Sequence, residues 1–74
     1  MNPKILKAMT DEQLESEAAK LFGRRASLTV RAAKAYKRNS MDELAELKVF
    51  YDAVDEVIEM LDREAELRVE EAVG

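Results

Sequence analysis

Apolar residues recur every three or four positions along most of this chain, and polar residues occupy the positions between them. This spacing is typical of amphipathic helices and differs from the strict alternation of a half-buried strand. The 74 residues include only two glycines and one proline. Ala, Leu, Glu, Lys and Arg, which favour helices, are abundant. Together these observations predict an all-α protein.

The first helix is predicted over residues 11–22, after a short turn at residues 4–8. Thr10 and Gln13 have the spacing of a capping box, in which each side chain binds the backbone N–H of the other residue. Gly23 can adopt the left-handed conformation that ends a helix. The expected apolar face of this helix consists of Leu14, Ala18, Leu21 and Phe22.

The second helix is predicted over residues 27–38, with Ser27 as its N-cap. Lys37 and Arg38 in the last turn suit the negative end of the helix dipole. Asn39 then interrupts the pattern. The apolar side is short and is made of Leu28, Ala32, Ala35 and Tyr36.

The third helix is predicted over residues 41–70 and is the dominant element. Ser40 and Glu43 have the spacing of a second capping box. At 1.5 Å per residue this helix is about 45 Å long, so its last two turns are expected to project, and its acidic end either frays or meets a partner. Its heptad-like seam is Leu44, Leu47, Tyr51, Val54, Ile58, Leu61 and Ala65, widened by Phe50 and Val57.

The predicted fold is a single domain over residues 1–74. It is a small three-helix bundle with two short helices packed on one long C-terminal helix. A chain of this length buries only about 60% of its unfolded surface, and without cysteine it has no disulfide to compensate. We therefore expect self-association through an exposed part of the seam, with a dimer favoured.

Charge is segregated along the chain. Residues 18–41 contain seven basic residues and no acid, whereas residues 42–74 contain twelve acids and three basic residues. The net charge of the whole chain is −4. An acidic helix attracts basic surfaces and speeds their encounter, which favours a protein partner with a basic surface.

Two interpretations of the basic segment remain open. It is either the cationic half of a charge-paired bundle or a surface that neutralises the phosphates of a nucleic acid. The candidate nucleic-acid-binding residues are Arg24, Arg25, Arg31, Lys34, Lys37 and Arg38.

The stretch RRASL, residues 24–28, has the pattern of a site for basophilic serine kinases, with Ser27 as acceptor. A phosphate at a helix N-terminus beside two arginines would be well accommodated. The role of a helix cap explains the same serine without a kinase, and this is the interpretation we adopt.

The sequence contains no candidate catalytic, metal-binding or cofactor-binding site. Cysteine and histidine are absent, and no glycine-rich phosphate loop occurs. We therefore expect a protein that is not an enzyme and needs no cofactor. No segment resembles a signal peptide or a transmembrane span, which predicts a cytoplasmic protein that does not bind membranes.

The segment ELKVFYDAVDEVIEML, residues 46–61, resembles a helix of the Hha/YmoA family of small enterobacterial modulators. The matching residues are Glu46, Leu47, Phe50, Tyr51, Ala53 and Asp55. The resemblance implies a helical protein without enzymatic activity that docks on the nucleoid protein H-NS. It also implies that Asp55 pairs with an arginine of that partner. The family's aromatic C-terminal helix is replaced here by an acidic extension.

These observations favour a small non-enzymatic adaptor or modulator that binds another protein through its acidic helix. Its size and composition would suit a phage- or plasmid-encoded protein that regulates a host nucleoid or transcription component. A nucleic-acid-binding protein and a structural homo-oligomer are the alternatives. The candidate protein-binding residues are Asp52, Asp55, Glu56, Glu59 and Asp62.

Overall fold

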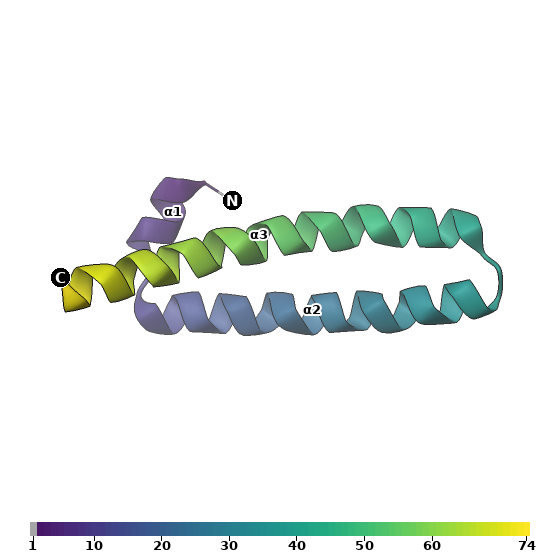
Figure 1. Ribbon diagram of the computed structural model, residues 1–74, viewed down its shortest axis with the longest axis horizontal. Helices are drawn as coiled ribbons and strands as arrows, with labels where there is room; N and C mark the ends of the chain where they lie inside the picture. Colours follow the sequence, from purple (N-terminus) through teal and green to yellow (C-terminus); the bar gives the residue numbers. More distant parts are fainter. Residues whose placement is uncertain (1) are drawn as a thin grey trace.

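A computed structural model describes residues 2–74 and contains three helices and no strand within that range. These are α1 (Pro3–Ala8), α2 (Asp11–Lys37) and α3 (Met41–Val73). The two long helices form an antiparallel hairpin, and α1 lies across α3 near the open end (Figure 1). The all-α prediction is therefore confirmed, but the arrangement is a long hairpin with one short accessory helix.

The main difference from the prediction is that α2 is a single helix of 27 residues. Neither the helix end predicted at Gly23 nor the cap predicted at Ser27 exists, and the helices predicted over 11–22 and 27–38 are one element. Gly23 does not have a positive φ, and Ser27 is exposed in the helix interior. The third helix is therefore not paired with two short helices but with one of nearly its own length.

The hairpin is held by a heptad seam that runs without interruption through both helices. In α2 the seam positions are spaced alternately by four and three residues, and the same pattern continues along α3. A glycine costs a helix roughly 0.5–1 kcal/mol relative to alanine, which is less than the packing lost if the seam were broken. The seam residues are Leu14, Ala18, Leu21, Arg25, Leu28, Ala32 and Ala35 in α2, and Leu44, Leu47, Tyr51, Val54, Ile58, Leu61, Ala65, Arg68 and Ala72 in α3.

The buried core is small and lies mainly toward the open end of the hairpin. Leu6 of α1 joins two leucines of α2 and two residues of α3 in one buried cluster, against which Met9 and Met60 pack. Three of the predicted core aromatics lie outside it, because the seam turns them to the flank or the outer side of their helices. Phe22, Tyr36 and Phe50 are 48%, 67% and 61% exposed.

The start of α2 is as predicted. Thr10 Oγ1 accepts a hydrogen bond from the Gln13 N–H at 3.1 Å, and Gln13 Oε1 accepts one from the Thr10 N–H at 2.9 Å. The prediction of a second capping box at the start of α3 is wrong, because the Ser40 side chain makes no capping hydrogen bond.

The turn between the long helices explains what Ser40 does instead. Asn39 has a φ of 57°, and asparagine tolerates this left-handed conformation better than most residues. The Ser40 N–H donates to the carbonyl of Ala35 and the Asn39 N–H to that of Tyr36, which is the Schellman arrangement. The helix interruption predicted at Asn39 is therefore confirmed, and the turn at this residue ends α2.

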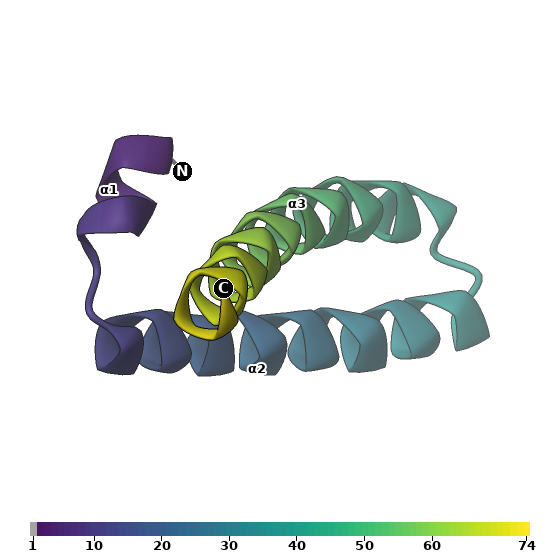
Figure 2. The same ribbon diagram turned by 60° about the vertical axis from the view of Figure 1, so that its left-hand side comes forward.

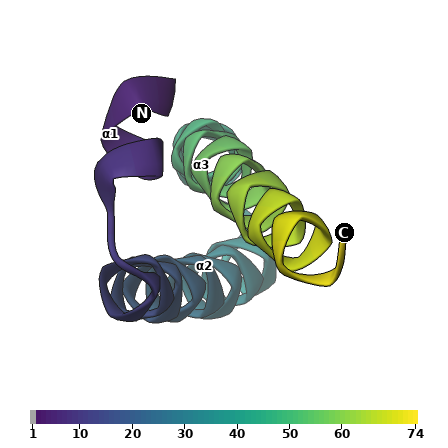
Figure 3. The ribbon, with the colours of Figure 1, turned by 90° about the vertical axis from the view of Figure 1, so that its left-hand side faces the viewer.

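Helix α3 is continuous to Val73, and its C-terminal end extends past the first turn of α2 (Figure 1). The two long helices cross at an angle (Figure 2), and α1 lies against one side of the pair (Figure 3). The other side of the hairpin is therefore left uncovered.

Gly23 offers a direct test of the continuous α2. A Cβ built at this position meets no atom within 4 Å. We expect Gly23→Ala to raise the free energy of unfolding by about 0.5–1 kcal/mol in urea denaturation, because alanine favours the helix interior. The reverse change at the exposed Ala26, Ala26→Gly, should lower it by a similar amount. A Gly23→Ala variant that is instead destabilised would indicate a left-handed helix end at Gly23.

Candidate functional site: an acidic apolar groove

The uncovered side of the hairpin carries a groove of about 440 Å³ near its open end. Its floor is formed by seam residues of both helices, such as Leu14, Ile58 and Leu61. Phe22 of α2 and Val69 of α3 line its walls and remain about half exposed, at 48% and 62%. The groove is therefore an apolar surface left open to solvent.

Carboxylates line the same groove. Asp11 and Glu15 come from the first turns of α2, and Asp62 comes from α3. Arg68 also lines the groove and pairs with Asp11, which leaves Glu15 and Asp62 as the rim carboxylates without an ion-pair partner within residues 2–74. The site therefore combines an apolar floor with a rim whose net charge is negative.

A second groove, of about 560 Å³, lies further along the hairpin toward the turn. Its lining includes Leu28, Thr29 and Tyr51, together with Lys48 and Asp52. Lys48 Nζ lies 2.8 Å from Asp52 Oδ2, and this hydrogen bond raises the pKa of Lys48 above its ordinary value. The lining of the second groove therefore carries one cation and one carboxylate and has no net charge, whereas that of the first groove is net negative.

The two grooves share one side of the hairpin. Their flanking residues follow the seven-residue repeat, with Glu15, Phe22 and Thr29 on α2 and Lys48 and Asp62 on α3. The i+7 spacing also places Asp55 in the row between these two α3 residues.

An ion pair joins the helices between the grooves. Arg25 Nη1 donates to Asp55 Oδ1 at 2.8 Å, and the Arg25 guanidinium lies 5.1 Å from the centre of the Phe22 ring. Both charged side chains are only partly exposed. Arg25 is the one charged residue of the α2 seam. Its guanidinium pairs with Asp55 beside the α3 seam, so the heptad packing continues through this position.

The predicted acidic site is thus divided by the structure. Asp62 lines the first groove, Asp52 lines the second and Asp55 pairs with Arg25 between them. Glu56 and Glu59 are exposed, and neither lines the first or the second groove. Asp55, which the family resemblance implied as a contact to a partner's arginine, is bound here by an arginine of the same chain.

The predicted basic residues are also divided. Arg25 points to α3, and Arg38 Nη2 lies 2.8 Å from Glu43 Oε2 across the turn. The other four are exposed and form no ion pair within residues 2–74: Arg24, Arg31, Lys34 and Lys37. Two of the six predicted basic residues, Arg25 and Arg38, are therefore paired with acids of α3, as expected for a charge-paired bundle.

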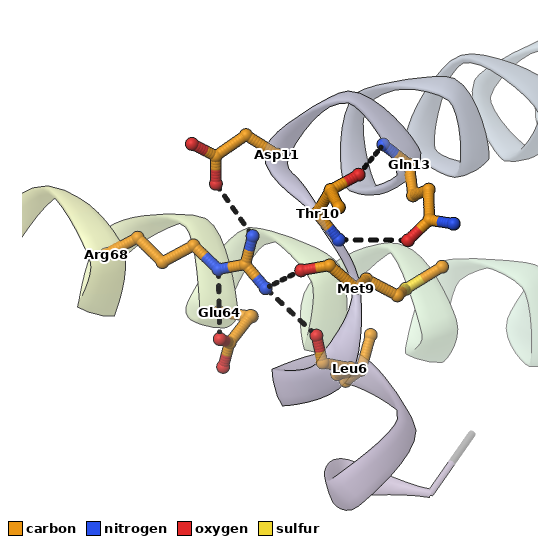
Figure 4. A network of polar contacts seen from close by, with 7 residues as sticks. All are labelled: Leu6, Met9, Thr10, Asp11, Gln13, Glu64 and Arg68. Atoms are coloured by element: carbon orange, nitrogen blue, oxygen red, sulfur yellow. Dashed lines mark hydrogen bonds and ion pairs between the residues drawn. The ribbon is translucent and has the colours of Figure 1, made fainter.

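The sequence interpretation missed Arg68, which joins α1 to α3 (Figure 4) and is also a lining residue of the first groove. Its guanidinium donates to the carbonyls of Leu6 and Met9 at 3.0 and 2.7 Å. It also pairs with Asp11 at 2.7 Å and with Glu64 at 3.1 Å. Hydrogen bonds to Asp11 and Glu64 raise the pKa of Arg68 above its ordinary value. The heptad position of Arg68 in the sequence could have indicated this role, because a charged side chain in the seam needs hydrogen-bond partners for its guanidinium.

No protein-family model matches this chain, and no curated protein or solved structure matches it significantly. Within residues 2–74, no cluster of three or more acidic side chains is arranged to hold a metal ion. None of the helices in that range has both the length and the apolar character required to cross a bilayer.

Proposed function

We propose that this protein is a small non-enzymatic adaptor that binds a basic amphipathic helix of another protein in the first groove. The observation that carries the proposal is the combination of an exposed apolar floor and a carboxylate rim on the side of the hairpin that α1 leaves open. A helix presents apolar residues at i, i+3, i+4 and i+7, which suits a groove between two helices. Lysine and arginine beside that stripe would meet the rim.

Charge also distinguishes this partner from a second copy of the chain. If two copies joined groove to groove about a twofold axis, Glu15 and Asp62 of one would approach the same acids of the other. Such like-charge contacts oppose association. A basic partner is attracted by the same carboxylates, so we favour a different protein over a second copy of this chain as the partner.

We expect both the apolar floor and the rim carboxylates to contribute to recognition of the partner. The apolar floor supplies the contact area, because removing apolar surface from water is the main favourable term in association. The acids on the rim increase the association rate and set the orientation of the incoming helix, and their effect decreases with salt.

The test uses a designed 18-residue helical peptide with a leucine stripe and lysines on its remaining faces. Its control keeps the lysines but replaces the leucines with glutamine. Chemical shifts of the ¹⁵N-labelled full chain are followed during titration. We expect the leucine peptide to shift the amides of Ala18, Phe22 and Val69 and the control peptide to leave them unchanged. Shifts confined to other surfaces would overturn the proposal.

A charge variant tests the rim. We expect Glu15→Gln combined with Asp62→Asn to weaken the leucine peptide about tenfold at low salt, with a smaller difference at high salt. The matched control, Glu46→Gln with Glu56→Gln, removes two exposed charges away from the groove and should have little effect. Equal weakening in both variants would mean that only the net charge matters.

Sedimentation equilibrium of the unliganded chain tests self-association. A mass that rises with concentration, and no longer does so in Val69→Glu, would assign the groove to a second copy instead.

A further inference from the structure

Because α2 is continuous, five exposed residues of this helix and Arg38, its C-cap, form a row along one face. Lys20, Arg24, Ser27, Arg31, Lys34 and Arg38 are spaced by four, three, four, three and four residues, which keeps them on one side of an α-helix. Five of the six are basic. We call this row the basic stripe.

The basic stripe lies outside the groove. In the heptad pattern its residues fall on the opposite flank of the α2 seam from Glu15, Phe22 and Thr29, which follow the grooved side. From Lys20 to Arg38 it extends about 27 Å at 1.5 Å per residue. The stripe and the groove can therefore be occupied at the same time.

Most of the charge on the stripe is not neutralised by the chain itself. Arg38 has an ion-pair partner in Glu43, whereas the structure records none for Lys20, Arg24, Arg31 or Lys34 within residues 2–74. No acid occurs in residues 18–41, so no carboxylate of α2 lies among them. Lys20 and Arg24, and likewise Arg31 and Lys34, are neighbours on the helix face and repel each other, and a polyanion would relieve this repulsion.

We propose that the basic stripe binds the phosphate backbone of a nucleic acid. Regularly spaced cations on a rigid helix can follow a line of phosphates and displace their condensed counterions. Phe50, 61% exposed on α3, falls on the same flank of the hairpin in the heptad pattern and offers a ring on which an unpaired base can stack. Acids of α3 share this flank with Phe50, among them Glu46 and Glu43, which is paired with Arg38, so we expect the contact to be confined to the stripe and the Phe50 ring.

An anionic membrane is the other extended surface with this charge, and the fold argues against it. A helix that binds a bilayer surface buries an apolar face in it. The apolar face of α2 is packed against α3, with Leu14, Leu21 and Ala35 buried. The stripe itself carries no apolar side chain that could enter the lipid.

The experiment measures anisotropy of labelled 20-nucleotide DNA, single-stranded and duplex, titrated with the full chain between 50 and 200 mM salt. If four cations each neutralise one phosphate, the slope of log K against log salt is about −3 for the single strand and about −4 for the duplex. The variant Arg24→Gln/Arg31→Gln/Lys34→Gln should reduce the slope by about 2–3 and the affinity at low salt at least about tenfold. Either form of DNA showing this behaviour supports the proposal.

The matched control removes the same number of charges elsewhere, as Lys4→Gln/Lys7→Gln/Arg63→Gln. All three residues are exposed and lie outside the stripe. This variant should keep the slope of the unmodified chain. Circular dichroism of both triple variants verifies that the hairpin is intact, and equal weakening of DNA binding in the two variants would overturn the assignment to the stripe.

Ser27 supplies a second variant that removes no basic residue. It lies between Arg24 and Arg31 in the row, so Ser27→Glu introduces an acid at the middle of the stripe. We expect a loss of DNA affinity of about tenfold or more, whereas Ala33→Glu, exposed on another face of α2, should have a smaller effect.

The outcomes separate the alternatives. No anisotropy change with either DNA at 50 mM salt would overturn the proposal. Binding to vesicles containing phosphatidylserine, sensitive to the stripe variants and without DNA binding, would overturn it in favour of a membrane. Because the peptide titration involves the opposite flank, its result and the DNA result can succeed or fail independently.

Discussion

Leu61→Ala should lower the free energy of unfolding by about 2–5 kcal/mol, the range for removing a buried leucine side chain. Leu61 is only 3% exposed and lies in the cluster that joins all three helices. A domain of this size has a total stability of roughly 4–11 kcal/mol, so this one change removes a large part of it. Urea denaturation followed by circular dichroism measures the loss.

The control for this change is Val49→Ala, because Val49 is 68% exposed on α3 and removing its methyl groups leaves no cavity. Its effect should stay within about 0.5 kcal/mol. If Leu61→Ala were no more destabilising than Val49→Ala, the buried cluster described here would not be the core of the folded protein.

The second large effect is expected from Arg68→Met, which keeps the apolar stem of the side chain and removes its charged tip. Two carbonyls at the end of α1 and two carboxylates would lose their donor. We expect α1 to detach from α3. The amides of Leu6 and Met9 should then lose most of their protection against hydrogen exchange, while the amides of α2 and α3 around Asn39 remain protected.

Arg68→Lys separates charge from geometry in the same experiment. A lysine keeps the positive charge but cannot direct donors toward four acceptors in a planar arrangement, so we expect it to restore protection only in part. Arg63→Met serves as the matched control, since Arg63 is exposed and forms no ion pair within the described residues. Unchanged exchange of the α1 amides in Arg68→Met would show that apolar packing alone holds that helix.

The sequence indicated correctly those features that depend on local chemistry. The capping box at Thr10 and the break at Asn39 each depend on a few neighbouring residues, and both are present. The seam of α3 was also recognised, because nearly every position of it is apolar.

The interpretation failed where a local signal competed with a longer repeat. Gly23 has a weak preference to end a helix, but the seam from Leu21 to Leu28 continues through it at the required spacing. Arg25 concealed this continuity because a charged residue stands at a position where an apolar one was expected. At Ser40 the capping box failed in both halves. The Ser40 N–H donates to Ala35 in the turn while the Glu43 carboxylate pairs with Arg38, and Ser40 has a ψ of 79° in place of the extended conformation in which an N-cap side chain reaches the first turn.

The candidate groove could not be derived from the sequence for a related reason. Dividing α2 into two helices removes the row that includes Glu15, Phe22 and Thr29, and with it the side of the hairpin that remains open. The acidic residues were recognised individually, but their division between two grooves and an ion pair depends on how α2 and α3 face each other.

The turn at Asn39 has a consequence for the order in which the molecule assembles. Contacts beside the turn, such as those of Ala35 and Leu47, close short loops, whereas Leu14 and Leu61 must close a loop of more than forty residues. Loop-closure entropy rises with loop length, so pairing is expected to start at the turn and proceed toward the open end. The open end is then the last part to close, and the buried cluster and Arg68, which binds carbonyls of Leu6 and Met9, stabilise it by joining residues from the two ends of the chain.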